Sequence, residues 1–477
     1  MWVLSASASG CRWLGAVGSL AVAAGGYAAG TLPVREPWGI WAPRGSGTAV
    51  AAAVLAYLGL TLLVAAWWRY GRLLADGVRD RVLVTLAWWT APLVLAPPLY
   101  SADVYSYIAQ GAMVLEGHDV YGAGPSVLGP GDLGADAADS VGGHWTDTPA
   151  PYGPVFLALA QGVVQLTGGE IVPAVLGMRL IALAALALIV WAVRGLGGGP
   201  GALWLGALNP LLLIHVVGGM HNDGLMIGLM LSGVVLAVRG RWVLGSVLVG
   251  LAMMVKSPAA VALLFIGVMV ARGHGVRGVV KGLVLPGAVA GAVAAGATLV
   301  AGTGFGWLRT QSVAGTIHTA LSVTSDIGLG LGLLVADDPE PVKGVVRTLG
   351  LVAALAVIAA LAWRAYRGRV DPVLGLGLSL IALVVLSPMV QPWYLLWGTV
   401  VVAAVAWRSR AGQLLVVLSA ALVYETAPSG RTPWYGFVAA GVVLVLGLWW
   451  ARREPWAQDS RPVHGPVVDR TVGRPRP

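Results

Sequence analysis

The chain has 477 residues, of which 57% are hydrophobic and only 11% are charged. Because soluble domains carry about 25% charged residues, this composition excludes an ordinary soluble protein. The net charge of +9 is the kind of excess that the cytoplasmic loops of a multispanning protein collect. The sequence has no basic patch with interleaved aromatic residues, which is the pattern that would indicate a nucleic-acid partner. The single cysteine, Cys11, cannot form an intrachain disulfide.

Apolar stretches long enough to cross the hydrocarbon core recur along nearly the whole chain. They predict an all-α, multispanning bundle of about 13–14 transmembrane helices. The first stretch is longer than the core of a signal peptide, so we interpret it as a retained span. The segments 154–168 and 327–336 are expected to be re-entrant or surface helices. The spans are expected near 13–31, 48–67, 82–99, 171–193, 200–217, 222–238, 241–256, 258–271, 277–302, 343–363, 370–387, 391–406, 411–426 and 433–451.

The distribution of basic residues predicts the orientation of the chain. With a cytoplasmic N-terminus, most Lys and Arg residues of the loops fall inside, including the clusters at 69–81 and 364–369. Both termini are then cytoplasmic, and the polar segment 100–153 is extracytoplasmic. Residues 1–451 are expected to form one polytopic domain in the cell membrane. The Pro- and Arg-rich tail 452–477 is expected to be a disordered cytoplasmic extension.

The segment 100–153 is the longest polar stretch, with seven Asp and Glu residues and no Lys or Arg. Within it, residues 103–115 have helical periodicity, and Asp103, Ser106 and Gln110 fall on one polar stripe. The pattern predicts a helix that lies in the membrane interface. There it would hold the Asp103 carboxylate where a lipid phosphate and a water-borne acceptor can meet. Capping of the helix N-terminus is the alternative role for Asp103.

Further polar groups recur at the same predicted membrane face. Each has a structural alternative, such as helix capping, snorkelling of a lysine or anchoring in the aromatic belt. Ionisable groups near membrane depth are nevertheless functional by default, and their convergence on one face predicts a site there. No zinc spacing, Walker loop or dinucleotide fingerprint is present. The groups are His221, Asn222, Asp223, Lys256, Arg309, Gln391, Trp393 and Tyr394.

Five sequence motifs, taken in order, resemble one family. They are S-A-D-V-Y-S-Y-I-A-Q-G at 101–111, G-H-D-V-Y at 117–121, W-T-D-T-P-A-P-Y-G-P at 145–154, N-P-L-L-L-I-H with H-N-D-G at 209–224, and S-P-M-V-Q-P-W-Y-L-L-W at 387–397. Over roughly residues 45–450 the chain resembles the actinobacterial polyprenol-phosphate-mannose-dependent α-1,6-mannosyltransferases. These belong to the type C (GT-C) superfamily of integral membrane glycosyltransferases.

The resemblance implies a catalytic acid in the first large outer loop, which by position is Asp103. It also implies polyprenyl-phosphate-mannose as the donor. The implied acceptor is a phosphatidylinositol-mannoside or mannan glycolipid of the lipomannan type. Many superfamily members have a second acid beside the first, but here Ala102 and Val104 flank Asp103. This weakens a metal-binding role; no cofactor is assigned, and the use of a divalent cation stays open.

Transfer from a sugar phosphate with inversion needs one base and one or two cations, because the phosphate leaves as an anion. We expect Asp103 to be the general base, and Lys256, with Arg309 second, to bind the donor phosphate. We expect the remaining candidates to line the substrate site: His221, Asn222 and Asp223 at sugar hydroxyls, Trp145, Tyr152, Trp393 and Tyr394 at sugar rings or the lipid, and Tyr107, Gln110 and Gln391. The alternatives are another polyprenyl-phosphate sugar in the same architecture, or a lipid flippase or transporter.

Overall fold

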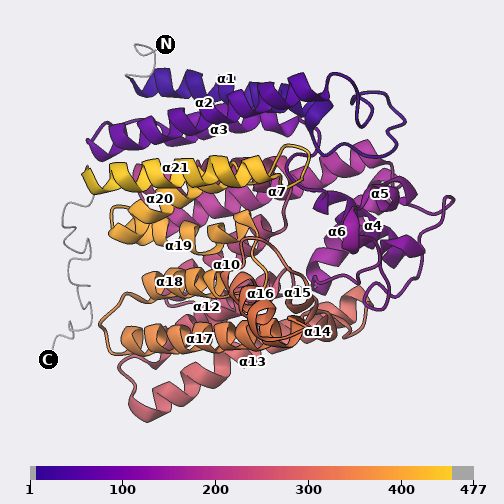
Figure 1. Cartoon of the computed structure of the whole chain (residues 1–477). Coiled ribbons are helices and arrows are strands. Elements are labelled where there is room, and N and C mark those ends of the chain that lie inside the picture. Colours follow the sequence, from indigo (N-terminus) through magenta and orange to yellow (C-terminus); the bar gives the residue numbers. More distant parts are fainter. Residues whose placement is uncertain (1–6, 454–477) are drawn as a thin grey trace, which may run out of the picture.

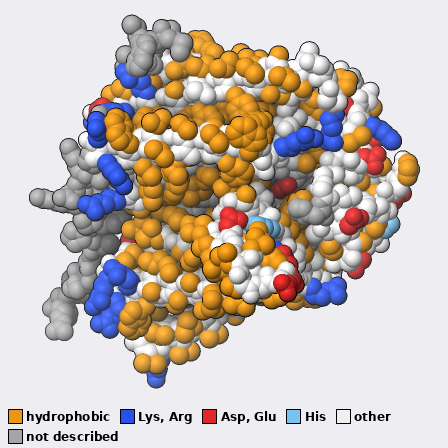
Figure 2. Space-filling model, viewed as in Figure 1, with side chains coloured by type: hydrophobic (Ala, Val, Ile, Leu, Met, Phe, Trp, Pro, Cys, Tyr) orange, Lys and Arg blue, Asp and Glu red, His pale blue; other side chains and the backbone are white. Residues whose placement is uncertain are grey.

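The computed structural model describes residues 7–453, which form helices and connecting loops with no strand among them. The long helices lie side by side in one bundle (Figure 1). Helix α1 begins and α21 ends at the left end of this view, whereas α4, α5 and α6 lie at the right end. Side chains of Lys and Arg gather at the left end, and hydrophobic side chains cover the flanks (Figure 2). Most of the predicted tail, 454–477, lies outside the described residues.

The helices coincide closely with the apolar stretches of the sequence. Five of them, α2, α7, α13, α17 and α21, are individually long and apolar enough to cross a membrane, and nine others have 10–17 residues. The fold class is therefore confirmed, although length alone supports fewer complete spans than the 13–14 expected. The helices are α1 (Ala8–Ala29), α2 (Ala49–Ala75), α3 (Val82–Val94), α7 (Ile171–Gly195), α10 (Asp223–Val238), α11 (Trp242–Met253), α12 (Val261–Ala271), α13 (Gly275–Ala301), α16 (Val323–Val335), α17 (Glu340–Tyr366), α18 (Pro372–Val385), α19 (Leu396–Ala406), α20 (Arg410–Leu422) and α21 (Trp434–Arg453).

The stretch expected as one span at 200–217 is broken. Helix α8 (Pro200–Gly206) and the segment Pro210–Gly218 meet at an angle of 44°. Pro210 has no N–H to donate and disfavours a helical conformation at the residue before it, and Asn209 is accordingly extended. The Asn209 side chain caps the new turn by accepting a hydrogen bond from the Leu211 amide at 3.0 Å. The break carries the chain into α9 (Pro210–Leu212) and the π-helical segment η4 (Leu213–Gly218).

Helix α4 (Asp103–Leu115) has the bounds that the periodicity predicts, but protein encloses it. Every residue from Val104 to Met113 is buried, so no face of that stretch lies open toward a membrane interface. It packs against α6 (Pro154–Thr167) and α5 (Ala135–Ser140). Gly111 makes the crossing with α6 possible, because a Cβ there would lie 2.6 Å from the Ala160 carbonyl carbon. The short 3₁₀ turns η2 (Pro125–Val127) and η3 (Gly143–Thr146) complete this region.

A buried arginine ties α7 to the turn that leads into α4. Arg179 is 1% exposed and donates hydrogen bonds to the carbonyls of Leu93 at 2.7 Å and Val94 at 3.0 Å. It also bonds the Gly218 carbonyl at 3.1 Å. These carbonyls include acceptors that a helix end leaves unpaired. Arg179 therefore fixes the end of α3 against η4, and both segments lead directly into the site.

Candidate active site

Two tight turns present the central side chains of the site. Tyr100 precedes Asp103 and has φ 64°, and Met220 precedes His221 and has φ 55°. They are the only non-glycine residues with positive φ among residues 7–453. Such backbone is costly for a residue with a side chain, and it persists where the surrounding structure imposes it. The amide of Leu99 donates to the Gly218 carbonyl at 3.2 Å, which joins the two turns directly.

Asp103 is the partly accessible carboxylate of the site. Its side chain is 25% exposed, and its Oδ2 lies 3.2 Å from Nδ1 of the fully buried His221. The Tyr107 hydroxyl donates to the same oxygen at 3.4 Å. Burial by itself raises the pKa of the Asp103 carboxyl, but His221, Ser101 and Lys256 together hold that pKa below its usual range. Asp103 is therefore an ionised carboxylate at neutral pH.

Lys256 supplies the positive charge. It follows the end of α11, and its ammonium donates to both carboxylate oxygens of Asp223 at 2.9 Å. Asp223 is fully buried and accepts a further hydrogen bond from Trp397 Nε1 at 2.7 Å. The ammonium also lies 4.4 Å from the ring centre of Tyr394 and 5.6 Å from that of Trp397, which are cation–π contacts. Asp223 and the two aromatic rings thus fix the position of Lys256.

Asp103 and Lys256 open into one cavity of about 370 Å³. Its walls are polar and aromatic near these two residues. Farther along, Leu355 and Ile358 of α17 and Leu383 of α18 make an apolar wall. The remaining lining residues are Trp145, Pro151, Tyr152, Ser257, Pro258, Val261, Thr310, Gln311, Ser387, Met389, Gln391, Trp393, Tyr394 and Trp397.

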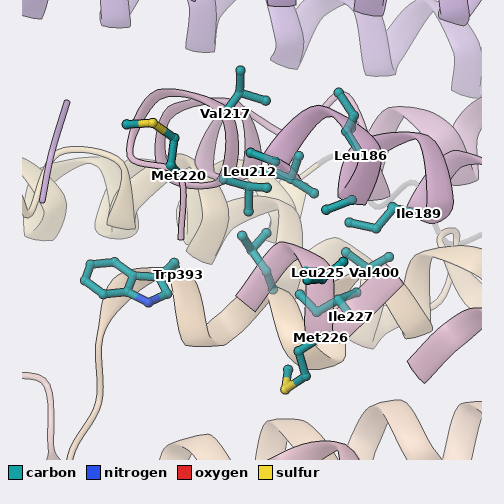
Figure 3. Packing of buried hydrophobic residues seen from close by; sticks show 14 of the residues in the cluster. Leu186, Ile189, Leu212, Val217, Met220, Leu225, Met226, Ile227, Trp393 and Val400 are labelled. Atoms are coloured by element: carbon teal, nitrogen blue, oxygen red, sulfur yellow. The ribbon is translucent and has the colours of Figure 1, made fainter. Parts of the chain in front are cut away.

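The hydrophobic core supports the site from behind. Leu186 and Ile189 of α7, Ile227 of α10 and Val400 of α19 belong to one buried cluster, in which Leu212 and Val217 lie nearer to Met220 and Trp393 stands at the edge (Figure 3). Trp393 belongs to the turn η6 (Pro392–Leu395), which leads into α19. The hydrophobic core therefore extends from these helices to the strained turn at Met220 and to the Trp393 wall of the cavity.

The predicted site residues fall into three groups. One group lines the cavity: Asp103, Trp145, Tyr152, Lys256, Gln391, Trp393 and Tyr394. A second group lies behind those residues: Tyr107 and His221 contact Asp103, and Asp223 binds Lys256. The third group does neither. Gln110 and Asn222 are buried outside the cavity lining. Arg309 is exposed on α14 (Trp307–Thr310), although its neighbours Thr310 and Gln311 line the cavity.

Some residues of the site were absent from the sequence-based candidates. Trp397 is one turn beyond Trp393 and Tyr394, and these i, i+4 and i, i+3 spacings could have indicated a shared face. The apolar wall of Leu355, Ile358 and Leu383 gave no signal, because its side chains resemble those of any membrane helix. In the described part of the chain, no three His, Cys, Asp or Glu side chains are grouped so that they could hold a metal ion.

Comparison with known proteins decides the family. Residues 12–272 match the model of the alpha-(1->6)-mannopyranosyltransferase N-terminal domain, and residues 318–453 match that of the MptB C-terminal domain. The chain belongs to the alpha-(1->6)-mannopyranosyltransferase family. A probable alpha-(1->6)-mannopyranosyltransferase of Mycolicibacterium smegmatis is 36% identical, with 94% of this chain and 90% of the relative aligned.

Two further relatives agree with this assignment. Alpha-(1->6)-mannopyranosyltransferase A of Mycobacterium tuberculosis is 34% identical over 91% of this chain and 88% of its own length. Alpha-(1->6)-mannopyranosyltransferase B of Corynebacterium glutamicum is 31% identical over 93% and 82%. The family that the sequence motifs resembled is thus confirmed. This alpha-(1->6)-mannopyranosyltransferase family member is an integral membrane glycosyltransferase whose described cavity carries one accessible carboxylate and one ammonium group.

Proposed function

We propose that this protein transfers mannose from polyprenyl-phosphate-mannose to an α-1,6-linked mannan or lipomannan-type glycolipid, with Asp103 as the general base. The observation that carries the proposal is the division of the cavity. One part presents a carboxylate, an ammonium and aromatic rings, and another is walled by Leu355, Ile358 and Leu383. A lipid-linked sugar phosphate has the same two parts, an apolar chain and a charged, hydroxyl-rich head.

Each chemical change in the reaction has a residue suited to it. The acceptor hydroxyl oxygen bonds to C1 of mannose as the bond from C1 to the phosphate oxygen breaks. The electrons of that bond leave with the polyprenyl phosphate, whose negative charge Lys256 offsets. The hydroxyl proton passes to Asp103. One base and one cation complete the balance, and inversion at C1 follows from a single displacement.

The pairing of Lys256 with Asp223 is compatible with phosphate binding. A lysine ammonium has three N–H donors, and its two hydrogen bonds to Asp223 leave the third for a ligand. Lys256 is also the better placed of the two predicted cations. It lines the cavity, whereas Arg309 is exposed outside that lining.

We also propose that the site faces the extracytoplasmic side of the cell membrane. The N- and C-termini would then both lie on the cytoplasmic side. The end at which α1 begins and α21 ends carries the concentration of Lys and Arg side chains (Figure 2). An excess of basic residues is typical of cytoplasmic loops. Helices α4 to α6, with Asp103, lie at the opposite end (Figure 1).

The test is transfer by purified protein in detergent from a panel of polyprenyl-phosphate sugars to a phosphatidylinositol-mannoside acceptor. We expect labelled mannose to be transferred, and glucose and arabinose to be transferred poorly, with an α-1,6 linkage in the product. Product from glucose or arabinose but none from mannose would assign a different donor. Movement of intact donor across proteoliposomes without any glycosidic product would instead support a flippase.

A further inference from the structure

His221 is placed unlike a ligand of sugar hydroxyls. Its side chain is fully buried, and it is absent from the residues that line the cavity. Asp103 lies between this imidazole and the cavity, because Asp103 lines the cavity while its Oδ2 is 3.2 Å from His221 Nδ1. The imidazole therefore has no direct contact with the cavity, and its polar contact there is made through the Asp103 carboxylate.

Several contacts hold the imidazole at that position. Its ring is stacked on Trp393, with the ring centres 3.6 Å apart and the planes at 22°. On another side the chain passes so closely at Gly219 that a Cβ there would lie 3.2 Å from His221 Cδ2 and 2.9 Å from the Leu99 carbonyl. Met220, whose backbone has a positive φ, directly precedes His221 in the chain. Stacking on Trp393, close packing at Gly219 and the strained turn at Met220 together restrict the position of the His221 side chain.

The environment of His221 also limits which partner it can have. Among the described residues, Nε2 of His221 has no hydrogen-bond partner, and Nδ1 lies 3.2 Å from Asp103 Oδ2 without the alignment of a formed hydrogen bond. The ring nitrogens of the neighbouring His215 and Trp393 Nε1 have no partner among those residues either. His215 lies in the π-helical segment η4, and such segments are frequent at functional sites. In the described structure, the acidic side chain that contacts a His221 ring nitrogen is that of Asp103.

We propose that His221 is a positioning residue, which donates from Nδ1 to Oδ2 of Asp103 and so fixes the orientation of the carboxylate toward the acceptor hydroxyl. This inference rests on the proposed function, in which Asp103 is the base. The side-chain contacts from His221 and from Tyr107 are made to the same oxygen, Oδ2. Rotation of the carboxylate is thereby restricted, and the base is held where the hydroxyl proton must arrive.

Two substitutions at position 221 separate this role from simple packing. His221→Phe keeps a ring that can stack on Trp393 but has no N–H donor, whereas His221→Asn places an amide N–H near the position of Nδ1. We expect His221→Phe to lower kcat by a factor on the order of 10² with an unchanged KM for the donor, as for a misplaced catalytic group. His221→Asn should retain a larger share of kcat.

His215→Asn is the matched control, because His215 is equally buried and no hydrogen bond joins it to Asp103 among the described contacts. Thermal unfolding of all three full-length variants in detergent would show any loss that comes from folding alone. We expect His215→Asn to keep kcat well above that of His221→Phe at the same fraction of folded protein. An equal loss at position 215 would overturn the proposal.

A second readout does not depend on turnover. Carbodiimides modify protonated carboxyl groups, and Asp103 is exposed enough to be labelled and quantified by mass spectrometry. His221, Ser101 and Lys256 lower the Asp103 pKa, so the pH at which labelling begins should rise in His221→Phe and rise less in His221→Asn. Tyr107 remains in place in both variants.

Each other outcome has a distinct meaning. A raised donor KM with normal kcat would make His221 a sugar ligand and overturn the proposal. Equal losses in the Phe and Asn variants, with unchanged labelling, would reduce His221 to a packing residue. If the wild-type protein transferred no mannose, the proposed function would fail, while the labelling comparison would still decide whether His221 fixes Asp103.

Discussion

Asp103 and Asp223 are two carboxylates beside the same cavity, and they differ in accessibility and in the lengths of their contacts. Asp103 is 25% exposed, and its contacts with His221 and Tyr107 are 3.2 and 3.4 Å long. Asp223 is fully buried, and its hydrogen bonds from Lys256 and Trp397 measure 2.9, 2.9 and 2.7 Å.

The difference follows from what each carboxylate must do. A general base must reach its substrate and exchange a proton, so it needs accessibility and long, adjustable contacts. A buried carboxylate that binds an ammonium must stay ionised, because an unpaired buried charge is costly. Asp103 meets the first requirement and Asp223 the second. In the proposed mechanism their partners, His221 and Lys256, are correspondingly a positioning group and a charge directed at the substrate.

Among changes to the partners of the two carboxylates, removal of the Lys256 ammonium should have the largest effect. We expect Lys256→Met to lower kcat by a factor on the order of 10²–10³, the usual cost of losing one group that stabilises developing negative charge. Steady-state transfer assays would measure it. Arg309→Met, at the other predicted cation, should have a much smaller effect because Arg309 is exposed outside the cavity lining. The reverse ranking would move the phosphate site to α14.

Removal of the supporting carboxylate should act on stability. Asp223→Asn leaves the partly buried Lys256 without its counter-charge, and breaking one side of a fully buried pair costs about 3–5 kcal/mol in the free energy of unfolding, which is the upper limit expected here. Thermal or denaturant unfolding in detergent would show it. Asp326→Asn is the matched control, since Asp326 pairs with His318 at 2.8 Å but is half exposed, and such pairs contribute about 0.2–1 kcal/mol. Similar losses of unfolding free energy in Asp223→Asn and Asp326→Asn would show that Asp223 supports the fold no more than an exposed carboxylate does.

The smallest effect is that of mild acid on the Asp103 base. Its pKa is held below the usual range by His221, Ser101 and Lys256, against the effect of burial. The base is active when ionised, so its contribution is complete above the ordinary carboxyl pKa of about 4 and falls only as the pH drops through the lowered value. We expect no loss of kcat attributable to Asp103 between pH 7 and 5. A loss of kcat between pH 7 and 5 in the wild-type protein, absent from the Asp103→Glu variant, would contradict the lowered pKa of Asp103.

Apolar periodicity predicted the helices well, because burial and membrane crossing demand the same long hydrophobic stretches. It missed what depends on contacts between distant segments. The break at Asn209–Pro210 is stabilised by Ser419 of α20, which accepts from the Asn209 amide at 2.9 Å. Helix α4 begins and ends where predicted, yet its enclosure depends on the close approach of Gly111 to Ala160 of α6. No local pattern in 103–115 contains that partner.

The polar residues of the site were predictable because they interrupt otherwise apolar segments. Their individual directions were not. His221 and Asp223 are two positions apart, and the strained turn at Met220 and the start of α10 direct one to Asp103 and the other to Lys256. Both had been expected at sugar hydroxyls. The structure shows them behind the cavity, and their roles there are the ones that the substitutions above test.

Single-turnover transfer by Asp103→Asn is the measurement that tests the central claim most directly. Asparagine keeps the shape of the side chain but removes the base, so mannose transfer should slow by a factor on the order of 10²–10⁴, while binding of polyprenyl-phosphate-mannose and the unfolding temperature stay close to wild type. A folded Asp103→Asn protein that transfers mannose at a near-normal rate would show that Asp103 is not the base.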